Sequence, residues 1–357
     1  LRREAFEKLY ARYREHRNTL AAIFNTSVKG DIFYARQRRH ESALAAALHP
    51  DNVPGAVYDN LIATVREHLP ALHRYLRLRR RVLGLDELHM YDLYVPLVRD
   101  VSFRVPYEEA QRIVKAGLAP LGEEYGSVLD LAFAGRWIDV YENQGKSSGA
   151  YMRDVYGVHP YVLLNYQGNI DDVFTLAHEL GHAVHSHYSM NHQPYVYANY
   201  SIFVAEVAST VNEALLVHHL LNTEKDPQRR LFVVNYYLEQ FRTTVYRQTM
   251  FAEFERAVHR HAEEGQALTA DSLCEIYRRL NLDYYGAEVH VDAEIDMEWS
   301  RIPHFYHAFY VYKYATGFSA ANAIARAILA GEPGARERYI ELLKAGGSDY
   351  PLEILKR

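Results

Sequence analysis

The chain has 357 residues, which allows a large hydrophobic core in one or two domains. Its formal net charge is -5 with both signs spread evenly, which excludes the basic surface typical of proteins that bind nucleic acid or anionic membranes. The single cysteine, Cys274, excludes an intramolecular disulfide and a cysteine-ligated metal centre and favours a reducing, cytoplasmic environment, while no apolar run is long enough for a transmembrane helix.

The first third of the chain is predicted to be a helical scaffold without chemistry. Apolar residues at helical spacing, together with prolines and glycines at the ends, predict helices over 2–25, 31–48 and 54–84, the last with a kink at Pro70, and a helical pair over 106–133 with a break at Pro120. The first of these is expected to end at the turn Asn25-Thr-Ser. Residues 85–105 are expected to form an extended linker.

Two short runs rich in β-branched and aromatic residues, 137–142 and 160–166, predict a small β-sheet. The Gly/Ser-rich segment 143–151 between them is expected to be a flexible tip. It lacks the first glycine of a phosphate-binding loop, so a turn is expected there instead. The run 160–166 is either a strand with a free edge that could pair with an extended peptide or an ordinary internal strand.

Helical patterns return after the sheet. We expect helices over 170–188, 202–221, 227–261, 268–280 and 305–330, with a last short helix before Gly346 and an irregular acidic region over 283–303. The sequence therefore predicts a mainly α protein with a small β-sheet directly before the helix at 170–188.

The helix predicted over 170–188 carries the motif His178-Glu179-Leu-Gly-His182, after Asn169 as a good N-cap residue. On a helix, His178 and His182 lie one turn apart on one face, the separation that two ligands of a tetrahedral zinc ion require. Glu179 follows the first histidine, where its carboxylate can reach a metal-bound water and act as the general base of H-E-x-x-H metallopeptidases.

The same motif also occurs by chance on solvated helix faces. Here Leu176, Leu180 and Val184 make the rest of the helix apolar, so most of its sides are expected to be buried. Buried imidazoles and carboxylates need partners, and a metal ion supplies one. The neighbours of the motif therefore favour the metal site.

A catalytic zinc site usually has three protein ligands, so one more is needed. Tyr188 stands where the H-E-x-x-H-x-x-G-x-x-H pattern would place a third histidine, which excludes that class. His185 is a further turn along and is expected to hydrogen-bond or line the cleft rather than bind the metal. Glu206 and Glu213 lie seven residues apart on one face of the helix over 202–221, and either could ligate while the other orients a histidine.

Three stretches together carry a family resemblance: His178 to His182, Asn199 to Ser209 and Ile302 to Gly317. They closely resemble the oligoendopeptidase F group of the thimet-oligopeptidase-like zinc metallopeptidases, and the similarity extends over most of the chain. The resemblance implies one Zn²⁺ ion bound by His178, His182 and Glu206, with Glu213 supporting the site.

The resemblance also implies a role for the Tyr-rich segment. His304, Tyr310 and Tyr314 match a histidine and tyrosines that face the metal in the family and can stabilise negative charge on the carbonyl oxygen. If this segment is helical, positions 310 and 314 share a face. Tyr306 and Tyr312 are close enough to compete for the role, and core packing is the alternative for each tyrosine.

We therefore expect a zinc-dependent endopeptidase that hydrolyses short oligopeptides with a metal-activated water and Glu179 as general base. The alternatives are a non-catalytic, zinc-stabilised helical peptide-binding protein and a metal-free helical scaffold. Residues 1–105 are expected to lead as helical scaffold into a zincin-type catalytic region over 106–357. The resemblance also implies a further N-terminal lobe and a C-terminus that continues beyond Arg357. Either the chain was cut, or the lobe is a separate fragment, which is then an expected partner beside peptide substrates.

Overall fold

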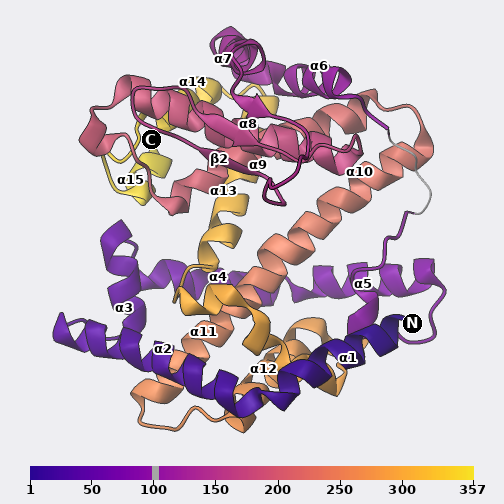
Figure 1. The fold of residues 1–357 in the computed structure, drawn as a ribbon, viewed down its shortest axis with the longest axis vertical. Helices are drawn as coiled ribbons and strands as arrows, with labels where there is room; N and C mark the ends of the chain where they lie inside the picture. Colours follow the sequence, from indigo (N-terminus) through magenta and orange to yellow (C-terminus); the bar gives the residue numbers. More distant parts are fainter. Residues whose placement is uncertain (99–103) are drawn as a thin grey trace. The chain divides into compact units, whose positions relative to one another are not determined.

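The computed structural model describes residues 1–98 and 104–357. These residues form two compact units, each made of two segments: Leu1–Leu97 with Gln240–Ala315, called the first unit below, and Val98–Glu239 with Thr316–Arg357, called the second unit. Helices dominate both (Figure 1), which confirms the mainly α fold. The expected functional division at residue 105 concerns catalytic role and remains a prediction.

In its described part, the regular elements of the first unit are all helical turns or helices. Its α-helices are α1 (Arg2–Glu15), α2 (Arg17–Gln37), α3 (Ala43–Leu48), α4 (Gly55–Glu67), α5 (Leu69–Leu83), α11 (Arg247–Glu263) and α12 (Ala270–Tyr285). Shorter 3₁₀ or π turns are η1 (His49–Asp51), η2 (Met90–Asp92), η5 (Phe241–Tyr246), η6 (Gly286–Glu288), η7 (Ala293–Arg301) and η8 (Pro303–Tyr306). Phe24 of α2 packs against Phe254 of α11 and Trp299 of η7, so an aromatic core joins the early and late segments.

The second unit combines helices with the sheet. Its elements are α6 (Tyr107–Leu118), η3 (Ala119–Leu121), α7 (Gly122–Ala134), β1 (Ile138–Asp139), β2 (Tyr151–Arg153), β3 (Tyr161–Leu163), α8 (Ile170–His192), η4 (Tyr195–Tyr197), α9 (Ile202–Thr223), α10 (Pro227–Gln240), α14 (Ala335–Lys344) and α15 (Pro351–Lys356), and most of α13 (Tyr312–Leu329). Helices α8 and α9 lie side by side at its centre (Figure 1). Both contribute many residues to its apolar core.

The predicted boundaries of the first two helices are wrong. Helix α2 runs through the Asn25-Thr-Ser stretch without a break, and the Thr26 hydroxyl donates to the Ala22 carbonyl one turn earlier, at 2.8 Å. The chain leaves the helix after Gln37 instead, with Arg39 at a φ of 62°. Ser42 then caps the short helix α3, its side chain accepting from the Ala45 N–H at 3.0 Å.

The sheet forms where the sequence predicts it, with one strand more. The runs 137–142 and 160–166 contain β1 and β3, which pair in parallel. Strand β2, at the end of the segment expected to be a flexible tip, pairs antiparallel with the other side of β3. The strand order β1-β3-β2 makes β3 the central strand, so the option of a free edge at 160–166 is wrong.

The helix predicted over 305–330 begins only at Tyr312. Phe309 stops it from starting earlier, because this residue has a φ of 59°, in the left-handed region. Its N–H donates to the buried carboxylate of Glu255 on α11 at 2.8 Å, and its ring packs on His259. Tyr310 therefore lies in a loop, and the argument that 310 and 314 share a helix face is wrong.

The remaining predictions concern longer segments. The helix expected over 227–261 is α10, the π-helical turn η5 and α11, so its helical character is confirmed. The expected linker over 85–105 contains η2, and its residues 99–103 lie outside the described part. Among the described helices, none combines the length and apolar character needed to span a bilayer.

Candidate metal centre

Helix α8 begins where the sequence predicts. The Asn169 side chain accepts from the Asp172 N–H at 2.9 Å, and the Asp172 carboxylate accepts in return from the Asn169 N–H at 3.0 Å. The same carboxylate oxygen also accepts from the N–H groups of Gln167 and Gly168. This capping box fixes the start of the helix and therefore the direction in which residues 178 and 182 point.

Gly181 brings α8 and α9 into backbone contact. A Cβ atom at this position would lie 2.6 Å from the Ser209 Cα and 2.7 Å from the Ala208 carbonyl oxygen, closer than real Cβ atoms come. Only glycine therefore permits this approach. The glycine of the motif has a structural role, because it lets α9 place its carboxylates beside the α8 histidines.

Replacing Gly181 with alanine is expected to lower the free energy of unfolding by about 2 kcal/mol, because the clash with backbone atoms outweighs the roughly 1 kcal/mol that alanine gains in helix propensity. Urea denaturation of the two proteins measures this difference. Gly126→Ala on α7 is the matched control, since a Cβ there meets nothing within 4 Å, and it is expected to be neutral or stabilising. A Gly181→Ala protein as stable as the wild type would show that the close approach is unimportant.

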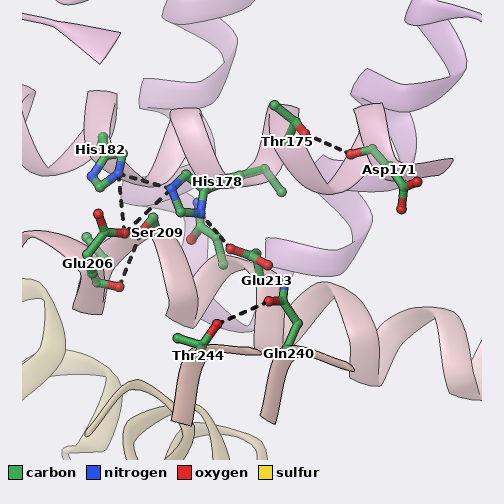
Figure 2. A network of polar contacts seen from close by, with 12 residues as sticks. Asp171, Thr175, His178, His182, Glu206, Ser209, Glu213, Gln240 and Thr244 are labelled. Carbon is green, nitrogen blue, oxygen red and sulfur yellow. Dashed lines mark hydrogen bonds and ion pairs between the residues drawn. The ribbon is translucent and has the colours of Figure 1, made fainter. Parts of the chain in front are cut away.

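The three predicted ligands lie together between α8 and α9 (Figure 2). The His178 Nε2 atom is 3.2 Å from the His182 Nε2 atom. The Glu206 Oε2 atom lies 3.6 Å from His178 Nε2 and 3.7 Å from His182 Nε2. All three side chains are partly exposed, so an ion can reach them from solvent.

These separations fit one tetrahedral ion. Ligand atoms about 2.05 Å from a tetrahedral zinc lie about 3.3 Å from each other. The three measured separations, 3.2 to 3.7 Å, bracket this value. Two imidazole nitrogens and one carboxylate oxygen are also a donor set that zinc uses in hydrolytic enzymes. The residues present therefore fit zinc.

Glu213 lies behind His178 rather than beside the other two ligands. Its Oε1 atom accepts from His178 Nδ1 at 2.5 Å, and its Oε2 atom accepts from the Tyr236 hydroxyl at 2.9 Å. This carboxylate fixes the ring and leaves Nε2 facing Glu206, the usual role of a carboxylate that supports a metal-binding histidine. Ser209 holds Glu206 in the same way, donating to its Oε2 atom at 3.0 Å.

The two histidines have different protonation states in this arrangement. Burial lowers the pKa of His178, but the hydrogen bond to Glu213 and the nearby carboxylates outweigh burial and raise it to about 9. Burial and the charge on His178 lower the pKa of His182 to about 4. A protonated His178 therefore donates to both Glu213 and the neutral His182.

Glu179 is buried next to this centre, with 6 % of its surface exposed. Burial raises the pKa of its carboxyl to about 7, and the charge on His178 acts in the opposite direction. Its Oε2 atom has no hydrogen-bond partner among the described residues. A carboxylate with a pKa near neutrality and an unsatisfied oxygen is suited to exchanging a proton with a bound water.

His185 is excluded from the cluster by its surroundings. Its ring stacks on the Tyr200 ring with centroids 3.6 Å apart, and it is fully buried. Neither ring nitrogen has a hydrogen-bond partner in the described part of the chain, so the expectation that it hydrogen-bonds is wrong. The hydroxyl of Tyr200 lies 2.7 Å from the Ser186 hydroxyl, which donates to the Asp154 carboxylate at 2.7 Å.

His304, Tyr310 and Tyr314 form a cluster of their own in the first unit. The Tyr314 hydroxyl lies 3.4 Å from His304 Nε2, and the Tyr310 and Tyr314 rings are 5.4 Å apart. Of the competing tyrosines, Tyr312 is buried and packs on Tyr58, which is the core role. The geometry therefore brings together the three residues that the resemblance selects, and their catalytic role remains a prediction.

Sequence reasoning missed several supporting residues. Ser209 and Tyr236 hold the two glutamates, and Asn212 bridges the helices by donating to the Ala177 carbonyl at 2.9 Å while accepting from Tyr125. Ser209 and Asn212 could have been noticed as polar residues in the apolar pattern of α9. Tyr236 carried no signal, because nothing in the sequence brings residue 236 near 213.

Comparison with known proteins identifies the family of the chain. All 357 residues match peptidase family M3. The oligopeptidase PepF of Bacillus subtilis is 53% identical over 357 residues, and the group B oligopeptidase PepB of Streptococcus agalactiae is 47% identical over 358. The matches cover 100% of this chain but only 53% and 59% of those two proteins.

A solved structure matches along the same length. The oligoendopeptidase F from Enterococcus faecium has 42% sequence identity and a TM-score of 0.79, over 99% of this chain and 57% of that one. The chain therefore spans between half and three-fifths of the length of the relatives it matches. Since the family match extends over residues 1–357, this chain belongs to peptidase family M3.

Proposed function

We propose that the chain is a zinc-dependent endopeptidase that hydrolyses short oligopeptides at the centre formed by His178, His182 and Glu206. One observation supports this most strongly: three ligand atoms at tetrahedral separations lie beside a buried glutamate with an unsatisfied oxygen. The names of the longer relatives, oligopeptidase and oligoendopeptidase, suggest the substrate class. A separate N-terminal lobe as a partner stays a prediction.

In the proposed mechanism, zinc bound at this centre supplies Lewis-acid polarisation of the peptide carbonyl and makes a water easier to deprotonate. Glu179 accepts a proton from the attacking water and returns it to the leaving amine. Its pKa of about 7 suits both transfers, because the group can hold or release a proton near neutral pH. Glu213 keeps His178 oriented through both steps.

We also propose that Tyr310 or Tyr314, with His304, donates a hydrogen bond to the oxygen on which negative charge develops. The contact between the Tyr314 hydroxyl and His304 supports this, because it holds the phenol and the imidazole side by side. The exposed position of His304 and the partial exposure of both tyrosines leave them accessible to a peptide.

The alternative of a non-catalytic, zinc-stabilised binding protein is less well supported. A structural zinc site normally uses four protein ligands. In the described residues, the group around His178 contains only three. Three protein ligands are the number that catalytic zinc sites use.

Product analysis tests the proposed function. The chain is incubated with short unlabelled peptides, and the products are identified by mass spectrometry with and without a zinc chelator. We expect cleavage at internal peptide bonds that stops when the chelator is added. Recovery of intact peptide bound to the zinc-loaded chain would favour the binding protein instead.

Zinc binding is expected to release a proton from His178. Because the pKa of His178 is raised to about 9, the group is protonated below that pH, and a metal at Nε2 must displace the proton. Zinc affinity should therefore rise by about tenfold per pH unit up to about pH 9 and then level off. His182, with its pKa lowered to about 4, adds nothing in this range.

Calorimetry in buffers of different ionisation enthalpy, at about pH 8, counts the protons released. Glu213→Gln removes the group that raises the pKa of His178, so this variant should release about one proton fewer per zinc ion than the wild type. Equal proton release by the two proteins would show that His178 is not protonated through Glu213.

A further inference from the structure

A second group of histidines and carboxylates lies in the first unit, apart from the centre on α8 and α9. His89 and His290 are side by side because their backbones form an isolated parallel β-bridge, in which the His290 N–H donates to the Leu88 carbonyl at 2.8 Å. Their rings are 4.8 Å apart between centroids. One ligand atom from each of His89, His290 and Asp292 lies within 4.8 Å of the others.

Asp292 fixes the orientation of His89. Its Oδ1 atom lies 2.9 Å from His89 Nδ1, and its Oδ2 atom accepts from the Met90 N–H at 2.9 Å. With both oxygens occupied, the carboxylate favours the tautomer in which Nδ1 carries the proton. His89 Nε2 then has a free lone pair, the arrangement of a metal-binding histidine supported by a carboxylate.

Glu87 lies opposite these nitrogens at a distance that suits a shared ion. Its Oε2 atom is 3.4 Å from His89 Nε2, and its Oε1 atom is 3.4 Å from His290 Nδ1. Direct hydrogen bonds of this kind span about 2.7–3.2 Å, whereas two ligands of one tetrahedral zinc lie about 3.3 Å apart. These two carboxylate–imidazole distances are close to the 3.6 and 3.7 Å that separate Glu206 from His178 and His182.

The charge and exposure of the group also suit a cation. In the described part of the chain, no ion pair joins Glu87 or Asp292 to a lysine or arginine, and the ion-pair partners of both carboxylates are imidazoles. The side chains of Glu87 and His290 are 61% and 51% exposed, which allows an ion to enter and water to fill the remaining position. A divalent ion would balance the two negative charges.

We propose that His89, His290 and Glu87 form a second site for a divalent transition-metal ion of the zinc type, with Asp292 orienting His89. Two imidazoles and a carboxylate are donors for Zn²⁺ rather than for Mg²⁺ or Ca²⁺, which prefer oxygen ligands alone. The ion would join the segment after α5 to the segment after η6. Its role is independent of peptide cleavage.

Zinc stoichiometry in the full 357-residue chain tests this site. The metal-free protein is titrated with Zn²⁺ alone, and bound zinc is measured by equilibrium dialysis and elemental analysis. His290→Ala is expected to bind one ion fewer per chain than the wild type and to keep the wild-type rate of peptide cleavage. Asp292→Asn should keep the second ion but bind it about 10–100-fold more weakly.

Three further variants make the result decisive. His16→Ala, at an exposed histidine outside the group, should bind as much zinc as the wild type. Glu206→Ala should lose the ion proposed at His178, His182 and Glu206 and keep the second one. This variant therefore tests the proposed catalytic site separately from the second site. Glu87→Gln, at an exposed side chain, should weaken the second ion at least about tenfold and replaces His290→Ala if circular dichroism shows that variant unfolded. Equal zinc binding by the wild type, His290→Ala and Glu87→Gln would overturn the proposal.

Discussion

Replacing Glu179 with glutamine is expected to lower the rate of peptide cleavage by about 10²–10⁴-fold while bound zinc stays at the wild-type level. The amide has almost the same shape as the carboxylate but cannot accept a proton from water. The three ligand atoms belong to other side chains, so the metal should remain bound. Initial rates on a quenched fluorescent peptide and elemental analysis of the same sample provide the two readings.

Glu341→Gln serves as the control for this substitution, since it makes the same chemical change at an exposed glutamate of α14 and should leave both readings unchanged. Wild-type activity in Glu179→Gln would contradict the proposed base. Loss of zinc together with activity would instead show that Glu179 helps to hold the ion.

Replacing Glu206 with alanine is expected to weaken zinc at the α8 and α9 centre by more than about 100-fold and to abolish cleavage. This carboxylate is the one that faces both histidine Nε2 atoms, at 3.6 and 3.7 Å. Competition with a chromogenic chelator measures the affinity. Glu213→Gln, by contrast, should weaken zinc only about 10–100-fold, because Glu213 contacts the far side of His178.

The relative loss of zinc affinity in the two variants shows which glutamate binds the ion and which one orients His178. The sequence pattern left both glutamates open, since positions 206 and 213 share a helix face. The structure separates them by which atom of His178 each one contacts, Nε2 for Glu206 and Nδ1 for Glu213. A larger loss of zinc in Glu213→Gln than in Glu206→Ala would reverse the assignment.

Local signals in the sequence were sufficient to predict α8, the helix that carries the two proposed histidine ligands. Asn169 and Asp172 form the capping box that starts α8, and the i and i+4 positions of His178 and His182 place both rings on one face. The short strands β1 and β3 were also visible, because β-branched and aromatic residues cluster there. In each case the residues that decide the structure lie within a few positions of each other.

Features that depend on distant partners were missed. The Phe309 N–H donates to Glu255, which lies 54 residues earlier in the sequence. The pattern of residues 305–330 therefore could not show that the helix starts at Tyr312. Strand β2 exists because it pairs with β3, although its own sequence looked like the end of a loop. The polar stretch at residues 25–27 wrongly indicated the end of a helix, because a threonine can stay in a helix with its hydroxyl bonded to the carbonyl one turn earlier.

The most direct test of the account follows zinc and cleavage together. Metal-free protein is titrated with zinc, and hydrolysis of a quenched fluorescent peptide is followed in each sample, with Glu179→Gln as the blank. We predict no cleavage before zinc is added, a rate that rises until the α8 and α9 centre is filled, and no rise in the blank. Cleavage at an equal rate in the metal-free protein, or a zinc-filled chain no faster than Glu179→Gln, would contradict the proposed centre.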